Sequence, residues 1–392
     1  MSLRDWRQAI RTPPAYRVGN STLRIQTQFI TVIAVIGLIA LIILYGVSSY
    51  GGGSRTRFTN DLKLHNEEYD HQHVISMSQP RPSPIQNQDN NINTHYYNST
   101  YPLTKPVKSK MGIKYRIGII SDLDTASKKE KEDIWVSYYH RGYLLWNPVT
   151  RKVSVTWDPG PVELSSQMAQ GGRAMELSEL VTFDGRLLTL DDRTGVIYEI
   201  VEHANPRVVP WVLLPDGDGR VSKGFKSEWA TVCHQQLYVG GLGKEWTTSK
   251  GELVNLNPMF VKRVSTSGAV EHLNWKENYI ALRRLLDIEF PGYVIHEAVG
   301  WSNVHKRWFF LPRRACKERY DEVSYVGDVV PTHGFSSFKF IPDTGDEIIV
   351  ALKSSEEAGK TATFITVFSI QGQVLMPETK VADLKYEGIE FI

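Results

Sequence analysis

Cysteine is scarce in this chain, and that scarcity excludes a fold held together by disulfides. Only two cysteines, Cys233 and Cys316, occur among 392 residues. A disulfide framework needs several pairs, so the folded part must be stabilised by a hydrophobic core instead. Whether the two cysteines pair with each other or stay as buried thiols is left open by the sequence.

An excess of charge of one sign is also lacking. The 45 Lys and Arg residues and 43 Asp and Glu residues are interspersed and give a net charge of +2. Nucleic-acid-binding domains usually carry a clear positive excess, so we expect no nucleic acid as partner. Neither HExxH nor paired CxxC motifs occur, which argues against a zinc enzyme. The stretch GGLGKEW at 240–246 lacks the spacing of a P-loop, and DGDG at 216–219 lacks the later ligands of a calcium loop, so a turn is predicted there.

Long hydrophobic runs are missing, with one exception at Phe29 to Val47, which is nearly all aliphatic and uncharged. A helix of this length, at about 1.5 Å per residue, covers roughly the 30 Å hydrocarbon core of a bilayer. The apolar core of a cleaved signal peptide would be shorter, roughly 7–15 residues, which makes a cleaved signal the less favoured alternative. Several arginines and the single acid Asp5 precede the run, and such a bias keeps the N-terminus cytosolic. The pattern predicts a single-pass type II membrane protein.

The region after the anchor is polar and rich in Asn, Gln, Pro and Ser, which is typical of a segment that cannot form a core. Asn98-Ser99-Thr100 is a glycosylation sequon within it, so Asn98 is the predicted glycosylation site. The expected organisation is a cytosolic tail at 1–28, a transmembrane signal-anchor at 29–47, a flexible lumenal stem at 48–110 and a folded domain at 111–392.

From Tyr115 onward, short apolar or aromatic runs alternate with polar turns, as in YRIGII, GYLLWN, KVSVTW and ITVFSI. These lengths and turn signals predict a mostly β domain. Only LNWKENYIALRRLL, from Leu273 to Leu286, has the spacing of a helix. Acidic or hydroxyl residues beside apolar ones recur at roughly the length of a propeller blade. In a propeller such residues would converge on the axis, where a calcium ion would offset their repulsion; the alternative is that they are solvated strand residues.

Several longer motifs identify a family. They are SDLDTAS at 121–127, DDRTGVIYEI at 191–200, YVGGLGKEWTT at 238–248, PGYVIHEA at 291–298, VVPTHGFSSFKFIPDT at 329–344, and PETK with KYEGIEFI at the C-terminus. Together they resemble the calcium-dependent apyrase family over residues 110–392.

The resemblance implies an all-β, five-bladed β-propeller with a central Ca²⁺ site. Two departures from the family are expected to matter. Glu179 stands where an aspartate is expected, and the chain is shorter than expected between Arg319 and Val326, which would remove part of the fourth blade. Carried onto matching positions, the metal ligands would be Ser178, Glu179, Glu228, Glu297, Ser336 and Glu387.

Phosphoanhydride hydrolysis needs groups that neutralise the phosphates and a positioned water. The candidate catalytic residues are Asp122, Asp124, Glu176, Arg173, Arg193, Lys244, Arg313 and His333. Each has a structural alternative: a turn for the paired aspartates, a surface ion pair for the basic residues, and a structural role for His333. Trp157 and Trp246 are candidates for stacking on a base, with core packing as the alternative.

The predicted function is calcium-dependent hydrolysis of nucleoside diphosphates, with UDP and GDP preferred, and of some triphosphates such as UTP. It would take place in the lumen of the Golgi or endoplasmic reticulum and support glycosylation and proteoglycan synthesis. The alternatives are another type II glycan-processing enzyme and a non-catalytic propeller that binds glycans or proteins. A homodimer and a secreted form released by cleavage are left open.

Overall fold

The structure is a computed structural model that describes residues 96–201, 205–319, 332–357 and 359–392, all within the unit Asn90–Ile392. The predicted tail and anchor, and most of the predicted stem, lie outside the described residues. Among the described residues, no helix is both long and apolar enough to cross a membrane.

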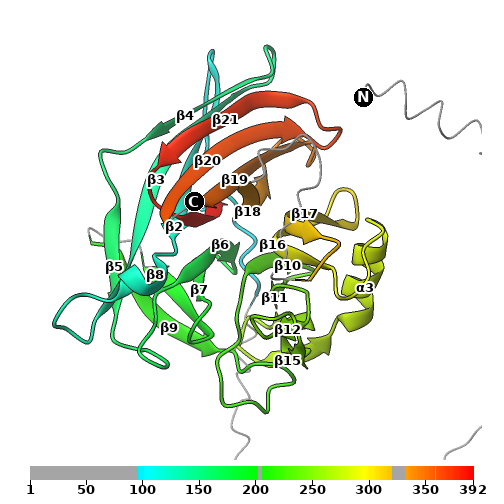
Figure 1. The fold of residues 1–392 in the computed structure, drawn as a ribbon. Coiled ribbons are helices and arrows are strands. Elements are labelled where there is room, and N and C mark those ends of the chain that lie inside the picture. The colour runs from blue at the N-terminus through cyan, green and yellow to red at the C-terminus, as the bar shows by residue number, and fades with distance from the viewer. Residues whose placement is uncertain (1–95, 202–204, 320–331, 358) are drawn as a thin grey trace, which may run out of the picture. The chain divides into compact units, whose positions relative to one another are not determined.

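The described residues form antiparallel sheets of a propeller-like, all-β domain (Figure 1). The first sheet contains β1 (Val107–Ser109), β2 (Gly112–Ser121), β3 (Trp135–Asn147), β4 (Lys152–Trp157), β5 (Val162–Ser166) and the C-terminal β22 (Tyr386–Phe391). The second contains β6 (Leu177–Phe183), β7 (Arg186–Asp191), β8 (Val196–Val201) and β9 (Arg207–Leu213). The third contains β10 (Trp229–Cys233), β11 (Gln236–Gly240), β14 (Phe260–Val264) and β15 (Val270–Asn274).

The remaining sheets differ in size. A hairpin of β12 (Trp246–Thr247) and β13 (Leu253–Asn255) is inserted between β11 and β14. A two-stranded sheet follows, with β16 (Tyr293–Ser302) and β17 (Arg307–Cys316). The last sheet contains β18 (His333–Phe340), β19 (Ile348–Glu357), β20 (Lys360–Ser369) and β21 (Val374–Ala382). The described residues therefore form four blades of at least four strands, not the five that the sequence predicts.

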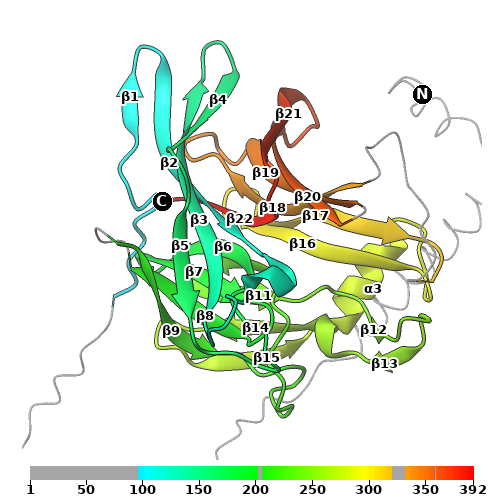
Figure 2. The same cartoon turned by 60° about the vertical axis from the view of Figure 1, so that its left-hand side comes forward.

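Five innermost strands contact one another in a closed order: β22 with β6, β6 with β10, β10 with β16, β16 with β18, and β18 with β22. The C-terminal strand β22 pairs with β2 from Ile117 opposite Phe391 to Ser121 opposite Tyr386, so both ends of the domain share the first sheet. Figure 2 shows β22 between β2 and β18. Pairing of the last strand with the first sheet removes the free edge that an open ring would leave.

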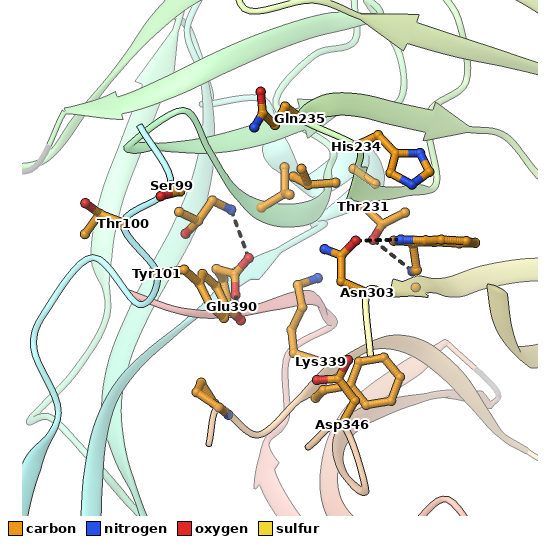
Figure 3. Close-up of a pocket in the computed structure, with 18 of the residues that line it drawn as sticks. Ser99, Thr100, Tyr101, Thr231, His234, Gln235, Asn303, Lys339, Asp346 and Glu390 are labelled. Carbon is orange, nitrogen blue, oxygen red and sulfur yellow. Dashed lines mark hydrogen bonds between the residues drawn. The ribbon is translucent and has the colours of Figure 1, made fainter. Parts of the chain in front are cut away.

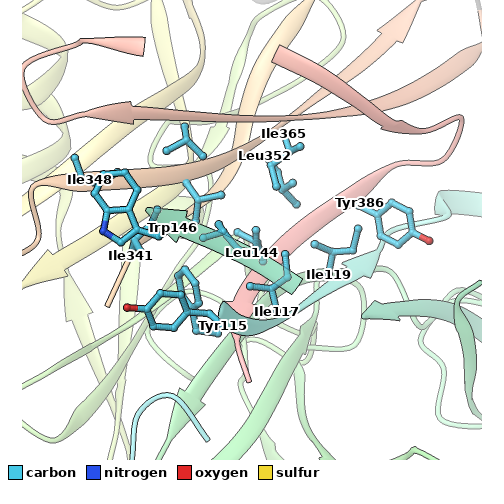
Figure 4. Close-up of a cluster of buried hydrophobic side chains, with 14 residues drawn as sticks. Tyr115, Ile117, Ile119, Leu144, Trp146, Ile341, Ile348, Leu352, Ile365 and Tyr386 are labelled. Carbon is cyan, nitrogen blue, oxygen red and sulfur yellow. The ribbon is translucent and has the colours of Figure 1, made fainter. Parts of the chain in front are cut away.

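Apolar side chains fill the spaces between neighbouring sheets. A cluster that includes Tyr115, Leu144, Ile348 and Ile365 joins the first sheet to the last (Figure 4). Similar clusters lie between the other neighbouring sheets. Burying these faces supplies the main stabilising free energy, because each blade alone would expose both faces to water.

Three smaller predictions can also be compared with the structure. The predicted helix at 273–286 is confirmed as α3 (Lys276–Arg284). Cys233 and Cys316 are buried thiols in different sheets, at the ends of β10 and β17. The packed chain begins before residue 111, since β1 pairs with β2 and the ring of Tyr97 lies 5.8 Å from that of Phe183.

Candidate functional site

Pairing irregularities occur in four of the five innermost strands, toward the end where each strand begins. In β18, for example, Phe335 pairs with Lys353 and Ser337 with Leu352, so the residue between them has no opposite partner. A bulge of this kind leaves one residue outside the ladder and changes the direction of its side chain. The residues skipped in this way are Ser178, Glu297, Ser336 and Glu387.

All four skipped residues are buried and are among the six predicted metal ligands. The fifth, Glu228, lies directly before β10, where its backbone N–H donates to the Gly240 carbonyl at 2.8 Å. Ser178 Oγ donates to the Ser227 carbonyl at 2.6 Å, which joins the second and third sheets at this level. The bulges thus place oxygen-bearing side chains of successive sheets at the same end of the ring of inner strands.

Two glutamates of this group are paired with a lysine two residues earlier. Lys226 Nζ lies 2.8 Å from Glu228 Oε1, and Lys385 Nζ lies 3.3 Å from Glu387 Oε1. Neither lysine was predicted as a site residue. The repeated Lys-x-Glu pattern in FKSEW and LKYEG is a signal that could have identified them, because it recurs at the start of two inner strands.

The third glutamate, Glu297, is paired across the two-stranded sheet. Arg313 Nε lies 3.3 Å from Glu297 Oε2, and its guanidinium also donates to Glu356 Oε1 at 3.1 Å. The predicted residue Arg313 therefore lies in this cluster. Each of the three inner glutamates has its own cation, which limits the repulsion between them.

Three further carboxylates, Asp122, Asp124 and Glu176, converge beside this group, with one oxygen from each within 4.8 Å of the others. Asp122 accepts a hydrogen bond from the Asp124 backbone N–H at 2.8 Å, so the predicted turn is present. Lys385 Nζ lies 2.7 Å from Asp122 Oδ2 and 3.2 Å from Asp124 Oδ2. Turn formation and convergence of the two acids therefore occur together.

Predicted basic residues surround Glu176. Arg173 donates two hydrogen bonds to this carboxylate, at 2.6 and 2.5 Å, and lies 3.6 Å from Asp124. Arg193 Nε lies 3.7 Å from Glu176 Oε1. A neighbouring carboxylate, Asp192, forms an ion pair with Lys226. We name the whole group the charged cluster; it comprises Asp122, Asp124, Arg173, Glu176, Asp192, Arg193, Lys226, Glu228, Glu297, Arg313, Glu356, Lys385 and Glu387.

Carboxylates outnumber cations in the charged cluster, and burial makes this costly. Burial raises the pKa of Glu228 to about 8 and that of Glu387 well above its usual range, although nearby lysines act in the opposite direction. Burial alone would also raise the pKa of Asp122, but the Lys385 ammonium brings it below its ordinary value. Asp192 Oδ1 is buried with no hydrogen-bond partner. A buried set of hard oxygen donors with excess negative charge fits Ca²⁺.

One predicted metal ligand is engaged elsewhere. Glu179 is fully buried, and its Oε1 accepts hydrogen bonds from Ser337 Oγ at 2.8 Å and Lys339 Nζ at 3.2 Å. The bulge at Ser178 separates these two neighbours, so that the serine belongs to the charged end and the glutamate to a different ion pair. A glutamate side chain is longer than that of the aspartate expected at this position, and the extra length lets the carboxylate reach Ser337 and Lys339.

Two predicted catalytic residues also have other contacts. His333 Nδ1 lies 2.8 Å from Glu378 Oε2, and its ring stacks on Phe364 at 4.1 Å. Lys244 is buried and donates to the Glu245 carbonyl at 2.8 Å, and burial lowers its pKa to about 8. The contacts of His333 match its structural alternative, whereas Lys244 is buried and not at the surface, where its alternative places it.

The two tryptophan candidates differ in exposure. Trp157 packs against His140, with ring centroids 5.3 Å apart. Trp246 is the most exposed tryptophan in the part of the chain that the structure describes, at 36%, and Lys223 Nζ lies 5.5 Å from its ring. The Ser222 carbonyl beside that lysine accepts a hydrogen bond from Gln170, on the loop of Arg173. Trp246 therefore adjoins loops that belong to the charged cluster.

A cavity of about 670 Å³ lies where the inner strands end (Figure 3). Thr182, Lys339 and Glu390, near the ends of β6, β18 and β22, line it. Along β22, Glu387 of the charged cluster and Glu390 of the cavity lining are three residues apart, so at about 3.3 Å per residue roughly 10 Å of strand separates them.

Comparison with known proteins places the sequence in a family. A family model described as apyrase matches residues 123–325 and 322–392. Soluble calcium-activated nucleotidase 1 of Rattus norvegicus is 52% identical over 318 residues, which cover 76% of this chain and 78% of the relative. Apyrase of Cimex lectularius is 46% identical over 320 residues, 75% of this chain and 87% of the relative. Apyrase apy-1 of Caenorhabditis elegans is 45% identical over 303 residues, 71% of this chain and 84% of the relative. The chain therefore belongs to the apyrase family of nucleotide-hydrolysing enzymes.

Proposed function

We propose that this enzyme hydrolyses nucleoside diphosphates in a calcium-dependent reaction, with UDP and GDP preferred and some triphosphates also accepted. The observation that carries the proposal is the convergence of bulged, oxygen-bearing residues with paired cations in a chain of this family. The names of its relatives, calcium-activated nucleotidase and apyrase, agree with it.

Calcium would be held by Glu228, Glu297 and Glu387 together with Ser178 and Ser336. These side chains offer the oxygen donors that Ca²⁺ prefers, and they belong to five different inner strands or their starts. When bound, the ion supplies Lewis-acid polarisation of phosphate oxygens. We leave Glu179 out of the ligand set because its carboxylate is bonded to Ser337 and Lys339.

The protein's own cations would bind the phosphates. Arg173 and Arg193 approach Glu176 from one side, while Lys226 and Lys385 lie on the inner glutamates. Guanidinium and ammonium groups neutralise the charge that builds up on phosphoryl oxygens during transfer. When a substrate binds, some of these cations would leave their carboxylate partners and contact the phosphate oxygens instead.

Asp122 and Asp124 would position the attacking water. Asp124 is half exposed, at 50% of its side chain, whereas Asp122 is buried and held by Lys385. Water attacks the terminal phosphorus, the bond to the bridging oxygen breaks, and a nucleoside monophosphate and phosphate leave. The exposed Asp124 carboxylate can accept the proton of that water and release it to solvent.

The domain would be a five-bladed propeller in which β16 and β17 form an incomplete fourth blade. The closed contact order of five innermost strands supports this number. The family model matches in two segments that meet at residues 322–325, where the sequence predicts a shortened loop.

We further propose that the enzyme is anchored as a type II protein, with this domain in the lumen of the Golgi or endoplasmic reticulum. Residues 29–47 support this by their length and lack of charge. Removal of UDP and GDP there would relieve inhibition of sugar transferases and support glycosylation. Protease protection of the domain in sealed microsomes tests the topology.

The activity is tested by measuring phosphate release from UDP, GDP and ADP by the purified chain. Calcium, magnesium and a calcium chelator are compared at equal protein concentration. Calcium-specific release, greater for UDP and GDP than for ADP, is expected. Equal release with magnesium would contradict calcium dependence, and absence of release under all conditions would contradict the enzymatic assignment.

A further inference from the structure

The cavity at the ends of the inner strands is closed on one side by the segment before the first sheet. We call residues 97–101 the strap. The Asn98 backbone N–H donates to Asp184 Oδ1 at 2.8 Å, and Tyr101 Oη donates to the buried Glu390 carboxylate at 2.9 Å. The strap is thereby fixed on the second sheet at one end and on β22 at the other, and Figure 3 shows Ser99 and Tyr101 at the cavity.

The charge of the lining excludes the nucleotides that bind at the charged cluster. Carboxylates of Asp184, Asp343, Asp346 and Glu390 line the cavity. Among the described residues that line the cavity, Lys339 is the only lysine or arginine, and it is already paired with Glu179 at 3.2 Å. An anion would meet a net negative wall, so the occupant must be neutral or cationic.

The remaining lining suits a neutral ligand rich in hydroxyl and amide groups. Gln235 and Asn303 carry amides, and Trp301 carries an indole ring. Ser99, Thr100 and Thr231 add hydroxyl groups to the lining. Aromatic faces beside neutral polar side chains are typical of sites that bind polar, ring-shaped ligands such as sugars.

The sequence supplies such a ligand at the rim. Asn98 both lines the cavity and begins the sequon Asn98-Ser99-Thr100. Its Oδ1 accepts a hydrogen bond from the Thr100 backbone N–H at 3.0 Å, which fixes the amide. A Cβ at position 185 would lie 2.1 Å from Asn98 Nδ2, so Gly185, with φ of +72°, leaves space for the nitrogen that carries the glycan.

We propose that the innermost N-acetylglucosamine units of an N-linked glycan on Asn98 occupy this cavity. The glycan would be transferred from a lipid-linked pyrophosphate donor: Nδ2 forms a bond to the sugar C1, the bond from C1 to the pyrophosphate oxygen breaks, and Nδ2 gives up one proton. The proposal rests on lumenal placement of the domain, not on nucleotide hydrolysis. The glycan would join the strap to the second, third and fourth sheets.

A double-mutant cycle tests the contact. The full chain is produced in a eukaryotic cell line, and mass spectrometry measures occupancy of Asn98. Thr100→Ala removes the sequon, Gln235→Ala removes a lining amide, and Thr100→Ser, which keeps the sequon, is the matched control. We expect Thr100→Ala and Gln235→Ala each to lower Tm by about 2–4 °C. In the Thr100→Ala background, Gln235→Ala should have no further effect.

A second measurement avoids the sequon variant. Enzymatic removal of the glycan from folded protein should be slow, and afterwards hydrogen exchange should increase in residues 231–235 and 299–303. An unmodified Asn98, additive effects in the cycle, or unchanged exchange after glycan removal would each overturn the proposal. None of these outcomes depends on phosphate release, so the proposed activity is judged separately.

Discussion

The two ends of the ring of inner strands belong to the same strands but carry different arrangements of charged side chains. Where the strands begin, bulges gather glutamates and serines, and carboxylates remain in excess of cations. Where they end, the buried Glu390 carboxylate accepts hydrogen bonds from Tyr101 and from the Thr182 and Phe391 backbone N–H groups. The comparison teaches that a buried carboxylate alone does not mark a metal site, because several oxygen donors must also converge at one place.

The largest effect is expected from Glu228→Gln at the charged end. This change removes a proposed calcium ligand and the partner of Lys226, and we expect kcat/KM for UDP to fall by about 10³-fold. Glu390→Gln, at the other end, is the control and should leave kcat/KM within about twofold, because its carboxylate is bonded to Tyr101 and to the Thr182 and Phe391 backbone N–H groups, away from the cations of the charged cluster. Equal losses in both variants would remove the functional distinction between the two ends.

A stability effect is expected at the ion pair between Glu179 and Lys339. Lys339→Met leaves Glu179 buried without its cation, and we expect unfolding in urea to require about 3 kcal/mol less free energy. Glu179→Gln combined with Lys339→Met should recover most of this loss, since no uncompensated charge then remains. Calcium-dependent activity per folded molecule should be unchanged, and a loss of calcium affinity in Lys339→Met would place Glu179 back among the ligands.

The smallest effect is expected at Trp246, and it tests whether the nucleotide base binds beside the charged cluster. Trp246→Ala should raise KM for UDP by about tenfold if the base stacks on this exposed ring, because base stacking contributes about 1–3 kcal/mol. Hydrolysis of inorganic pyrophosphate, which has no base, should be unaffected. Trp157→Ala is the matched control, since Trp157 packs on His140. Equal changes for UDP and pyrophosphate would exclude Trp246 as a base platform.

The sequence predicted much of the fold because strand lengths and turn residues are local properties. The helix near Lys276 and the β-rich domain were predictable for that reason. The separation of Ser178 from Glu179 was not, because a bulge depends on the partner strand and leaves no mark in a single segment. The contact between His333 and Glu378 was not predictable for a similar reason, since the two residues are 45 positions apart in the sequence.

The cavity could not be predicted at all. Its lining comes from the strap and from several sheets, and no spacing along the chain connects Asn98 with Gln235 or Asn303. The Lys-x-Glu pairs are the opposite case, since both partners lie within three residues. A local pattern could therefore have identified these parts of the charged cluster, but no local pattern could have identified the cavity.

Pairing of β22 with β2 has a consequence for protein synthesis. Glu387 and Lys385 follow all other residues of the charged cluster along the chain. A ribosome-bound chain that has folded its earlier sheets would still lack a ligand and its counter-cation until β22 leaves the exit tunnel. Products truncated before β22 would then be catalytically silent.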